Sequence, residues 1–242
     1  MAIPLLLITG LFFGFSFSYY YCSDKDRLAE TNHTEASETR TLYKAIKAST
    51  GHEIIEFDPT LTPHQEALEL LHTAADSALH HFNQSPSPLH GLARINEASK
   101  FFEQYLLEAI NTHNDFHCAY ATTSAGKTQR SGYPDLLITH RPSATRFYLD
   151  PKLYQEDLVT STQRTFYYSP KSTNQKITSD AVHLLIGFAH DGNDGSWKFT
   201  AWKITDLHSL PLHQKTEYNS SNKELYRSLL RKSDEFTHSD RE

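Results

Sequence analysis

Cysteine is almost absent from this chain, whose 242 residues include only Cys22 and Cys118. Domains held together by a disulfide framework need several cysteine pairs, so that class is excluded. Cys118 lies in the run FHCAYA, where we expect a small, buried, apolar residue. A chain of this length, with 38% hydrophobic residues, has enough material for one sizeable domain with a hydrophobic core.

Several active-site signatures are missing as well. The sequence contains no Gly-x-Ser-x-Gly, no phosphate-binding loop, no glycine-rich dinucleotide fingerprint and no cysteine pair with zinc-ligand spacing. Among its 15 histidines, four lie on the helix expected near residues 63–82 at spacings that do not suit a shared metal ion, and we expect them at the surface. His183, in AVHLLIGF, is expected in the core. HDGNDG lacks the later glutamate of a calcium loop and predicts a hairpin turn.

An excess of positive charge is also lacking, since the formal net charge is −6. Taken alone, this argues against a nucleic-acid partner. The excess of Asp and Glu, however, lies between Cys22 and Ala93, whereas the segment from Arg94 to Lys171 is close to neutral. The charge distribution therefore permits a polyanionic substrate in the second segment without predicting one.

No charged side chain occurs in residues 1–21, MAIPLLLITGLFFGFSFSYYY. This stretch is long enough to span a bilayer and also suits an export signal that is cleaved after Ser18. The basic residues expected at the start of a signal peptide are missing, so a retained membrane anchor and a cleaved signal both stay open. With either, residues 2–21 can associate with a membrane and the protein is anchored or exported, to the periplasm or outside the cell. Without a working leader it is cytoplasmic.

The rest of the chain suggests one domain behind a linker. Residues 22–62 are polar and predict a linker or loosely packed segment, with one short helix near residues 42–48. Residues 63–238 are expected to form the domain, and the family resemblance described below covers its core, residues 92–205. Helices are expected from Pro63, capped by Thr62, to Phe82, over residues 92–111 and over 222–232. The expected strands cover residues 118–123, 136–139, 147–153, 164–168, 182–188 and 197–204. Helices followed by a run of strands predict an α+β or mixed α/β fold.

The stretch GYPDLLITHRPSATRFYLDPKLY (residues 132–154) places polar clusters at the ends of two strand-like runs. Asp135 opens the first run, and Asp150 and Lys152 lie in the second. A hairpin turn centred on Ser143 would set Asp135 opposite Pro151, within one residue of Asp150 on the neighbouring strand. Asp150 and Lys152 are two apart and share a face of their strand. Pro151 has no N–H, which predicts an edge, a bulge or a strand end at that position.

Two carboxylates and a lysine on one sheet suit metal-assisted phosphodiester chemistry. Mg²⁺ or Mn²⁺ is held by one or two carboxylates, waters and phosphate oxygens, and helps to generate a hydroxide nucleophile. A nearby ammonium can orient the water or stabilise the charge that develops on phosphorus.

With Pro134-Asp135 followed by Asp150-Pro151-Lys152, after a helix that carries glutamates, the sequence resembles the PD-(D/E)XK nuclease superfamily. The resemblance implies a restriction-endonuclease-like fold, a mixed β-sheet flanked by helices, and an endonuclease that cleaves DNA with Mg²⁺ or Mn²⁺. It also implies that Asp135 and Asp150 bind the metal and that Lys152 is catalytic. The third acid would come from the helix, as Glu97, Glu103 or Glu108. We favour Glu97, with Glu103 as the alternate, because Glu97 lies furthest from the apolar face.

Basic and aromatic residues near this motif could contact nucleic acid. STQRTFYYSPK (residues 161–171) places Arg164 and Lys171 around three aromatic residues, and Arg130 precedes the motif. The other interpretation is a strand whose aromatic residues belong to the core.

Other functions remain open for the motif itself. The same fold could be a decayed nuclease that serves as a binding module. Asp135 and Asp150 could also be the acid and base of a glycosidase-like hydrolase, although such an enzyme has no need of Lys152. Finally, Asp135 could be a turn acid, with Asp150 and Lys152 on a solvated sheet edge.

Overall fold

The computed structural model describes residues 40–129, 131–162, 166–170, 174–193 and 195–213. By its contacts the chain divides into two units, Met1–Ser37 and Glu38–Glu242, and every described residue belongs to the second. The leader and the helix expected over residues 222–232 lie outside the described residues and stay predictions. Within the described ranges, no helix combines the length and the apolar character needed to cross a bilayer.

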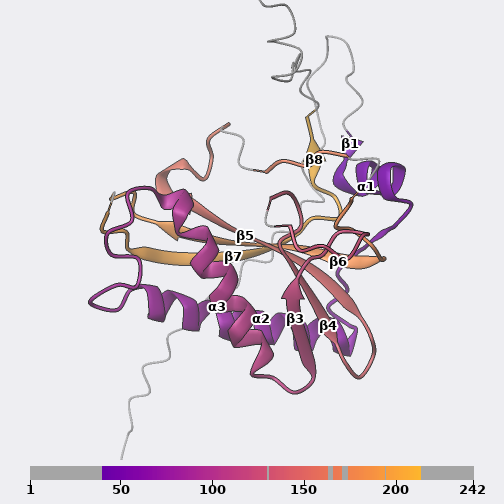
Figure 1. The fold of residues 1–242 in the computed structure, drawn as a ribbon, viewed down its shortest axis with the longest axis horizontal. Coiled ribbons are helices and arrows are strands. Elements are labelled where there is room, and N and C mark those ends of the chain that lie inside the picture. Colours follow the sequence, from indigo (N-terminus) through magenta and orange to yellow (C-terminus); the bar gives the residue numbers. More distant parts are fainter. Residues whose placement is uncertain (1–39, 130, 163–165, 171–173, 194, 214–242) are drawn as a thin grey trace, which may run out of the picture. The chain divides into compact units, whose positions relative to one another are not determined.

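A mixed six-stranded sheet forms the centre of the second unit (Figure 1). Its strands are β2 (Ile54–Ile55), β3 (Phe116–Tyr120), β4 (Leu136–His140), β5 (Arg146–Gln155), β6 (Ala181–His190) and β7 (Phe199–Asp206). They are ordered β2-β6-β5-β4-β3, and β7 also pairs with β6. The β3–β4, β4–β5 and β6–β7 pairs are antiparallel, whereas β5 and β2 both run parallel to β6. This architecture confirms the expected mixed sheet flanked by helices.

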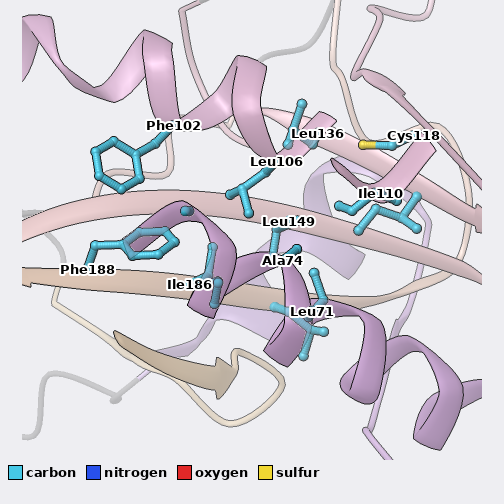
Figure 2. Packing of buried hydrophobic residues seen from close by; sticks show 14 of the residues in the cluster. Leu71, Ala74, Phe102, Leu106, Ile110, Cys118, Leu136, Leu149, Ile186 and Phe188 are labelled. Carbon is cyan, nitrogen blue, oxygen red and sulfur yellow. The ribbon is translucent and has the colours of Figure 1, made fainter. Parts of the chain in front are cut away.

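Helices α2 (Thr62–Phe82) and α3 (Ser99–Asn111) pack on one face of the sheet. Their apolar residues form the main core with residues of β3 to β7. The apolar stripe of each helix faces the strand side chains that alternate onto this face of the sheet. Figure 2 shows Phe102 of α3 beside Phe188 of β6, with ring centroids 4.6 Å apart. Leu136 and Leu149 belong to this core, which fixes the direction in which their strand neighbours point (Figure 2).

Helix α1 (Leu42–Thr50) belongs to a second core cluster. Leu42 and Ile46 are fully buried there with Tyr148 of β5. Close by, a two-stranded sheet joins β1 (Arg40–Thr41) to β8 (Pro211–Leu212). The helix expected near residues 42–48 is thus present, and the described part of the expected linker is packed instead of loose, since its Leu and Ile residues find an apolar partner surface.

Most expected elements are present with shifted ends, and one expected strand is not found in its described part. The helix expected from residue 92 begins at Ser99, after a short 3-10 turn over Ile95–Glu97. Residues 166–168, the described part of the strand expected over 164–168, are not in a strand. The remaining expected strands correspond to β3, β4, β5, β6 and β7.

The expected burial is confirmed for His183 but wrong for His64. His183 is fully buried, as expected, and Cys118 is buried as well. His64, expected at the surface, is only 3% exposed. Its ring stacks on Phe57, and its Nδ1 accepts a hydrogen bond from the Asp58 N–H. His64 is therefore a core residue whose ring nitrogen has a hydrogen-bond partner, which the sequence pattern did not indicate. The turn expected at HDGNDG does join β6 to β7.

The β4–β5 register differs from expectation by one residue. Leu136 pairs with Leu149, so Asp135, just before β4, aligns with Asp150 and not with Pro151. A slip of one residue exchanges the two faces of a strand, and this register puts both carboxylates on one face. β4 pairs with β5 only as far as Leu149, so beyond that point β5 has an edge on the β4 side where Pro151 is tolerated.

Candidate active site

Asp135, Asp150 and Lys152 come together on the sheet face opposite α2 and α3. Leu136 and Leu149 point into the main core, so Asp135 and Asp150, one residue away from each, point to the other face. Lys152 follows on the same face of β5. Its Nζ lies 2.6 Å from Oδ2 of Asp150 and 3.8 Å from Oδ2 of Asp135. The backbone carbonyl of Asp135 accepts a hydrogen bond from the Ala121 N–H at 2.9 Å, which anchors the start of β4 beside β3.

The two carboxylates are removed from solvent to different degrees. The side chain of Asp150 is 3% exposed, that of Asp135 is 14% exposed, and that of Lys152 is 32% exposed. Oδ2 of Asp150 is buried, and among the described residues it has no hydrogen-bond partner, because the nearby Lys152 ammonium stands at ion-pair distance but outside hydrogen-bond geometry. Burying this oxygen is costly, and the Lys152 ammonium at 2.6 Å offsets part of that cost.

Burial raises the pKa of Asp135 to about 7. Burial is the largest cause of this rise; the negative charge of Asp150, the Asp150 carboxyl group as a hydrogen-bond neighbour and the charge of Glu103 contribute to it, and the Lys152 ammonium opposes it. Two carboxylates this close cannot both be ionised cheaply, so the metal-free site retains a proton near neutral pH. Two carboxyl groups that lie this close can also share one ion.

This proton predicts how stability depends on pH in the absence of divalent ions. Asp135 loses its proton near pH 7 in the folded protein, but near pH 4 in the unfolded chain. Between those values the folded state binds more protons, so the free energy of unfolding decreases as the pH rises. Denaturation in EDTA at about pH 5 and about pH 8 measures this loss, and Asp135→Asn should reduce it. Equal pH dependence in wild type and variant would contradict the assignment.

The site offers oxygen ligands of the kind that Mg²⁺ and Mn²⁺ prefer. In the described ranges, no group of three or more His, Cys, Asp or Glu side chains is placed to hold an ion. Mg²⁺ does not require one, because it keeps several waters and binds through one or two carboxylates together with phosphate oxygens. Asp135 and Asp150 therefore fit a divalent cation. Oδ2 of Asp150, which has no hydrogen-bond partner among the described residues, lies 2.6 Å from Lys152 Nζ.

Of the glutamates considered for the third acid, Glu103 is the one whose charge acts on Asp135. Glu103 lies on α3, is half-buried, and contributes to the raised pKa of Asp135. Glu97 is exposed at the end of the 3-10 turn that precedes α3. Glu108 accepts a hydrogen bond from the Gln104 side chain on the exposed side of α3. Helix α3 begins at Ser99, later than the sequence suggested, so Glu97 is not on it. We therefore prefer Glu103 to Glu97 as the candidate for the third acid.

Three further residues lie near the site, and of these the sequence pointed only to His183, as a core residue. Tyr133 precedes the motif, and its Oη is 2.6 Å from Nδ1 of His183. Burial lowers the pKa of His183 to about 3, so this imidazole is neutral at ordinary pH. Lys176, from the segment before β6, is 6% exposed and donates hydrogen bonds to the carbonyls of Gly132 and Pro134. Only the folded chain brings Lys176 to the motif, so no local spacing could have revealed it.

The three basic residues expected to contact nucleic acid, Arg130, Arg164 and Lys171, lie outside the described residues and stay predictions. Another lysine does lie on the face of the site. Lys152 pairs with Gly187 of β6, which pairs in turn with the exposed Lys203 of β7. Directly paired residues point to the same face, so the two lysines flank a glycine in one row across the sheet.

Comparison with known proteins gives two matches. A family model described as the type II restriction enzyme MjaV family matches residues 36–229. A protein of Methanocaldococcus jannaschii named "Type II restriction enzyme MjaV" is 32% identical over 143 residues, which are 57% of this chain and 61% of that protein. The chain thus spans less than two thirds of this relative. The family match includes the whole of the site described above.

Proposed function

The chain belongs to the type II restriction enzyme MjaV family, and from this premise we propose that it is an endonuclease that cleaves DNA phosphodiester bonds with the help of a divalent metal ion. The observation that carries the proposal is the convergence of the buried Asp150, the largely buried Asp135 and one ammonium on a single sheet face, with Lys152 Nζ within 4 Å of both carboxylates. DNA as the substrate follows from the name of the family and of the matching relative.

Each residue of the site has a distinct task in this reaction. Asp135 and Asp150 hold Mg²⁺ or Mn²⁺, and the charge of Glu103 acts on the same site. When bound, the ion polarises the phosphate and lowers the pKa of a water molecule. The Lys152 ammonium would orient the water whose oxygen forms the new bond to phosphorus, and would offset the negative charge on the phosphate oxygens as the bond to the leaving oxygen, which takes up a proton, breaks.

The face that carries the site is suited to a polyanion. Lys152 and Lys203 present two ammonium groups in one row, with Gly187 between them. Neighbouring strands are about 4.8 Å apart, so the two lysine Cα atoms are separated by roughly twice that distance. Cations spaced along a surface neutralise successive phosphates and release counterions, which is the main source of affinity for DNA.

The geometry disfavours the two other functions considered from the sequence. A glycosidase keeps its two carboxyl groups about 5 Å or more apart so that a sugar or a water fits between them. Here Asp135 and Asp150 instead share one ammonium, because Lys152 Nζ lies 3.8 Å and 2.6 Å from their Oδ2 atoms. A decayed site would have no reason to retain two carboxylates close together and largely removed from solvent, since such a pair costs stability.

Cleavage of DNA by the purified full chain tests the proposal. With mixed-sequence unmethylated DNA we expect discrete fragments in Mg²⁺ or Mn²⁺ and none in EDTA, because the ion is needed to activate water. Protein that binds Mn²⁺ and DNA but cuts no DNA with any divalent ion would overturn the proposed activity and favour a binding module.

The same assay identifies the third acid through a matched pair of variants. Glu103→Gln should slow cleavage by about tenfold to a hundredfold, because it removes a charge that acts on the metal site. Glu97→Gln changes the same functional group on the same segment, but at an exposed position, and should cleave like wild type. The reverse result would restore Glu97 as the helix acid.

A further inference from the structure

A buried lysine holds the backbone that carries Asp135. Lys176 is 6% exposed and lies between two stretches that are distant in sequence. Its Nζ donates hydrogen bonds to the carbonyl oxygens of Gly132 at 2.7 Å and of Pro134 at 2.9 Å. These two carbonyls flank Tyr133, and the second belongs to the residue just before Asp135. The ammonium therefore acts on the position of the Asp135 backbone.

The segment that Lys176 holds is unusual in its backbone and is tied at further points. Gly132 has a φ of +84°, in the left-handed region that glycine adopts without cost. Tyr133 contacts the fully buried His183 through its hydroxyl group. The Asp135 carbonyl is bound by the Ala121 N–H. Short turns that precede a strand are normally free to shift, and these ties fix this one on both sides of Asp135.

The segment that carries Lys176 is itself fixed to β5. The Thr178 N–H donates a hydrogen bond to Oη of Tyr148 on β5 at 3.0 Å, and a second tie, from the Ser124 N–H to the Gln175 carbonyl at 2.8 Å, joins the segment to the loop after β3. Tyr148 lies two residues before Asp150 and therefore on the same face of β5. Lys176 thus connects the backbone before Asp135 with the strand that carries Asp150.

We propose that Lys176 is a positioning residue that sets the separation of the Asp135 and Asp150 carboxylates, and thereby the affinity of the site for a divalent cation. This inference deepens the proposed function, because it concerns the same metal site. The two carboxylates repel each other unless they share a proton or a cation. A preformed pair needs a restraint on at least one backbone, and a buried ammonium with two carbonyl acceptors supplies it at this position. Removing such outer partners typically costs about tenfold to a hundredfold in metal affinity.

The simpler interpretation is that Lys176 only stabilises the fold. Both interpretations predict a lower unfolding temperature for Lys176→Met, because this change removes the ammonium from a buried site and leaves two carbonyls without donors. Only the positioning role predicts a change in metal affinity in protein that remains folded. Mn²⁺ binding to the metal-free protein, without DNA, separates the two.

The experiment compares three variants with wild type by calorimetric titration of Mn²⁺ well below their unfolding temperatures. Lys176→Met should bind Mn²⁺ about tenfold to a hundredfold more weakly. Lys176→Arg, which keeps a charged donor, should lose less. Asn83→Ala is the matched control: the Asn83 side chain also makes two hydrogen bonds to backbone, at Phe199, but it follows α2 on the other face of the sheet. It should lower stability and leave Mn²⁺ affinity unchanged.

A Mn²⁺ affinity of folded Lys176→Met within about threefold of wild type would overturn the positioning role. If Lys176→Met does not fold, Gly132→Ala decides the question. A Cβ there meets nothing within 4 Å, so the variant strains only the backbone of the same turn. Weaker Mn²⁺ binding by Gly132→Ala supports the inference, and unchanged binding overturns it. If wild-type protein binds Mn²⁺ but does not cut DNA, only the endonuclease proposal is refuted, and the positioning role of Lys176 still stands.

Discussion

Asp150→Asn is expected to abolish DNA cleavage, by about a thousandfold or more, while the protein remains folded. Asp150 is the more buried of the two carboxylates, and its Oδ2 has no hydrogen-bond partner among the described residues. An amide of nearly the same shape fills the same space but is a poor ligand for Mg²⁺. Each factor of ten in rate corresponds to about 1.4 kcal/mol, so the loss of a few kcal/mol of metal-based stabilisation accounts for the effect.

The same substitution should spare stability, which separates it from a folding defect. Asp150 is one of the charges that raise the pKa of Asp135. Without that charge the pKa of Asp135 falls, and the metal-free protein becomes less sensitive to pH. We therefore expect an unfolding temperature equal to or above that of wild type, measured in EDTA, and undiminished DNA binding. Cleavage within tenfold of wild type would remove Asp150 from the mechanism.

Lys152→Met is the second large effect, with an expected loss of cleavage of about a hundredfold to a thousandfold. The ammonium is the cation closest to the carboxylates in the described structure, 2.6 Å from Asp150 and 3.8 Å from Asp135. Its removal takes away the group that offsets charge on the reacting phosphate, but leaves the metal ligands in place. Mn²⁺ affinity should therefore change far less than the cleavage rate. A parallel loss of both would assign Lys152 to the support of the carboxylates only.

A double variant controls for the loss of the ion pair. Lys152→Met leaves the buried Asp150 carboxylate without its ammonium, which should lower stability. Asp150→Asn combined with Lys152→Met removes both charges and should restore much of that stability while remaining inactive. If the double variant is as unstable as Lys152→Met alone, the ammonium stabilises the fold through contacts other than Asp150.

The sequence predicted the features of the site that depend on neighbouring residues, namely the hairpin and the shared face of Asp150 and Lys152. It did not predict those that depend on tertiary structure. Alternation of apolar residues in β4 and β5 predicted the hairpin, and Asp150 and Lys152 share a face because they are two residues apart. The register was wrong by one, because the residues of a five-residue turn do not reveal its centre. That error placed Asp135 opposite Pro151, although the carboxylates align directly.

The choice of helix acid rested on a helix boundary that the structure places elsewhere. Glu97 was favoured because a helix from residue 92 would leave it furthest from the apolar face. The chain instead forms a 3-10 turn and starts α3 at Ser99, so the projection used for that choice did not apply to Glu97. Contacts between distant segments, such as that of Lys176 with Gly132, could not be predicted from sequence periodicity. Periodicity describes neighbouring residues, and nothing in the sequence around either residue points to the other.

The turn between β4 and β5 lies at the far end of the hairpin from the carboxylates, yet it governs their alignment. Ser143 fixes it, with its Oγ 2.7 Å from both Nδ1 of His140 and Oγ1 of Thr145. Exposed turns usually accept insertions and deletions freely. Here, adding or removing one residue would rotate Asp135 to the opposite face from Asp150, whereas exchanging residues at constant length would not. The composition of this turn can therefore change without moving the carboxylates, but its length cannot.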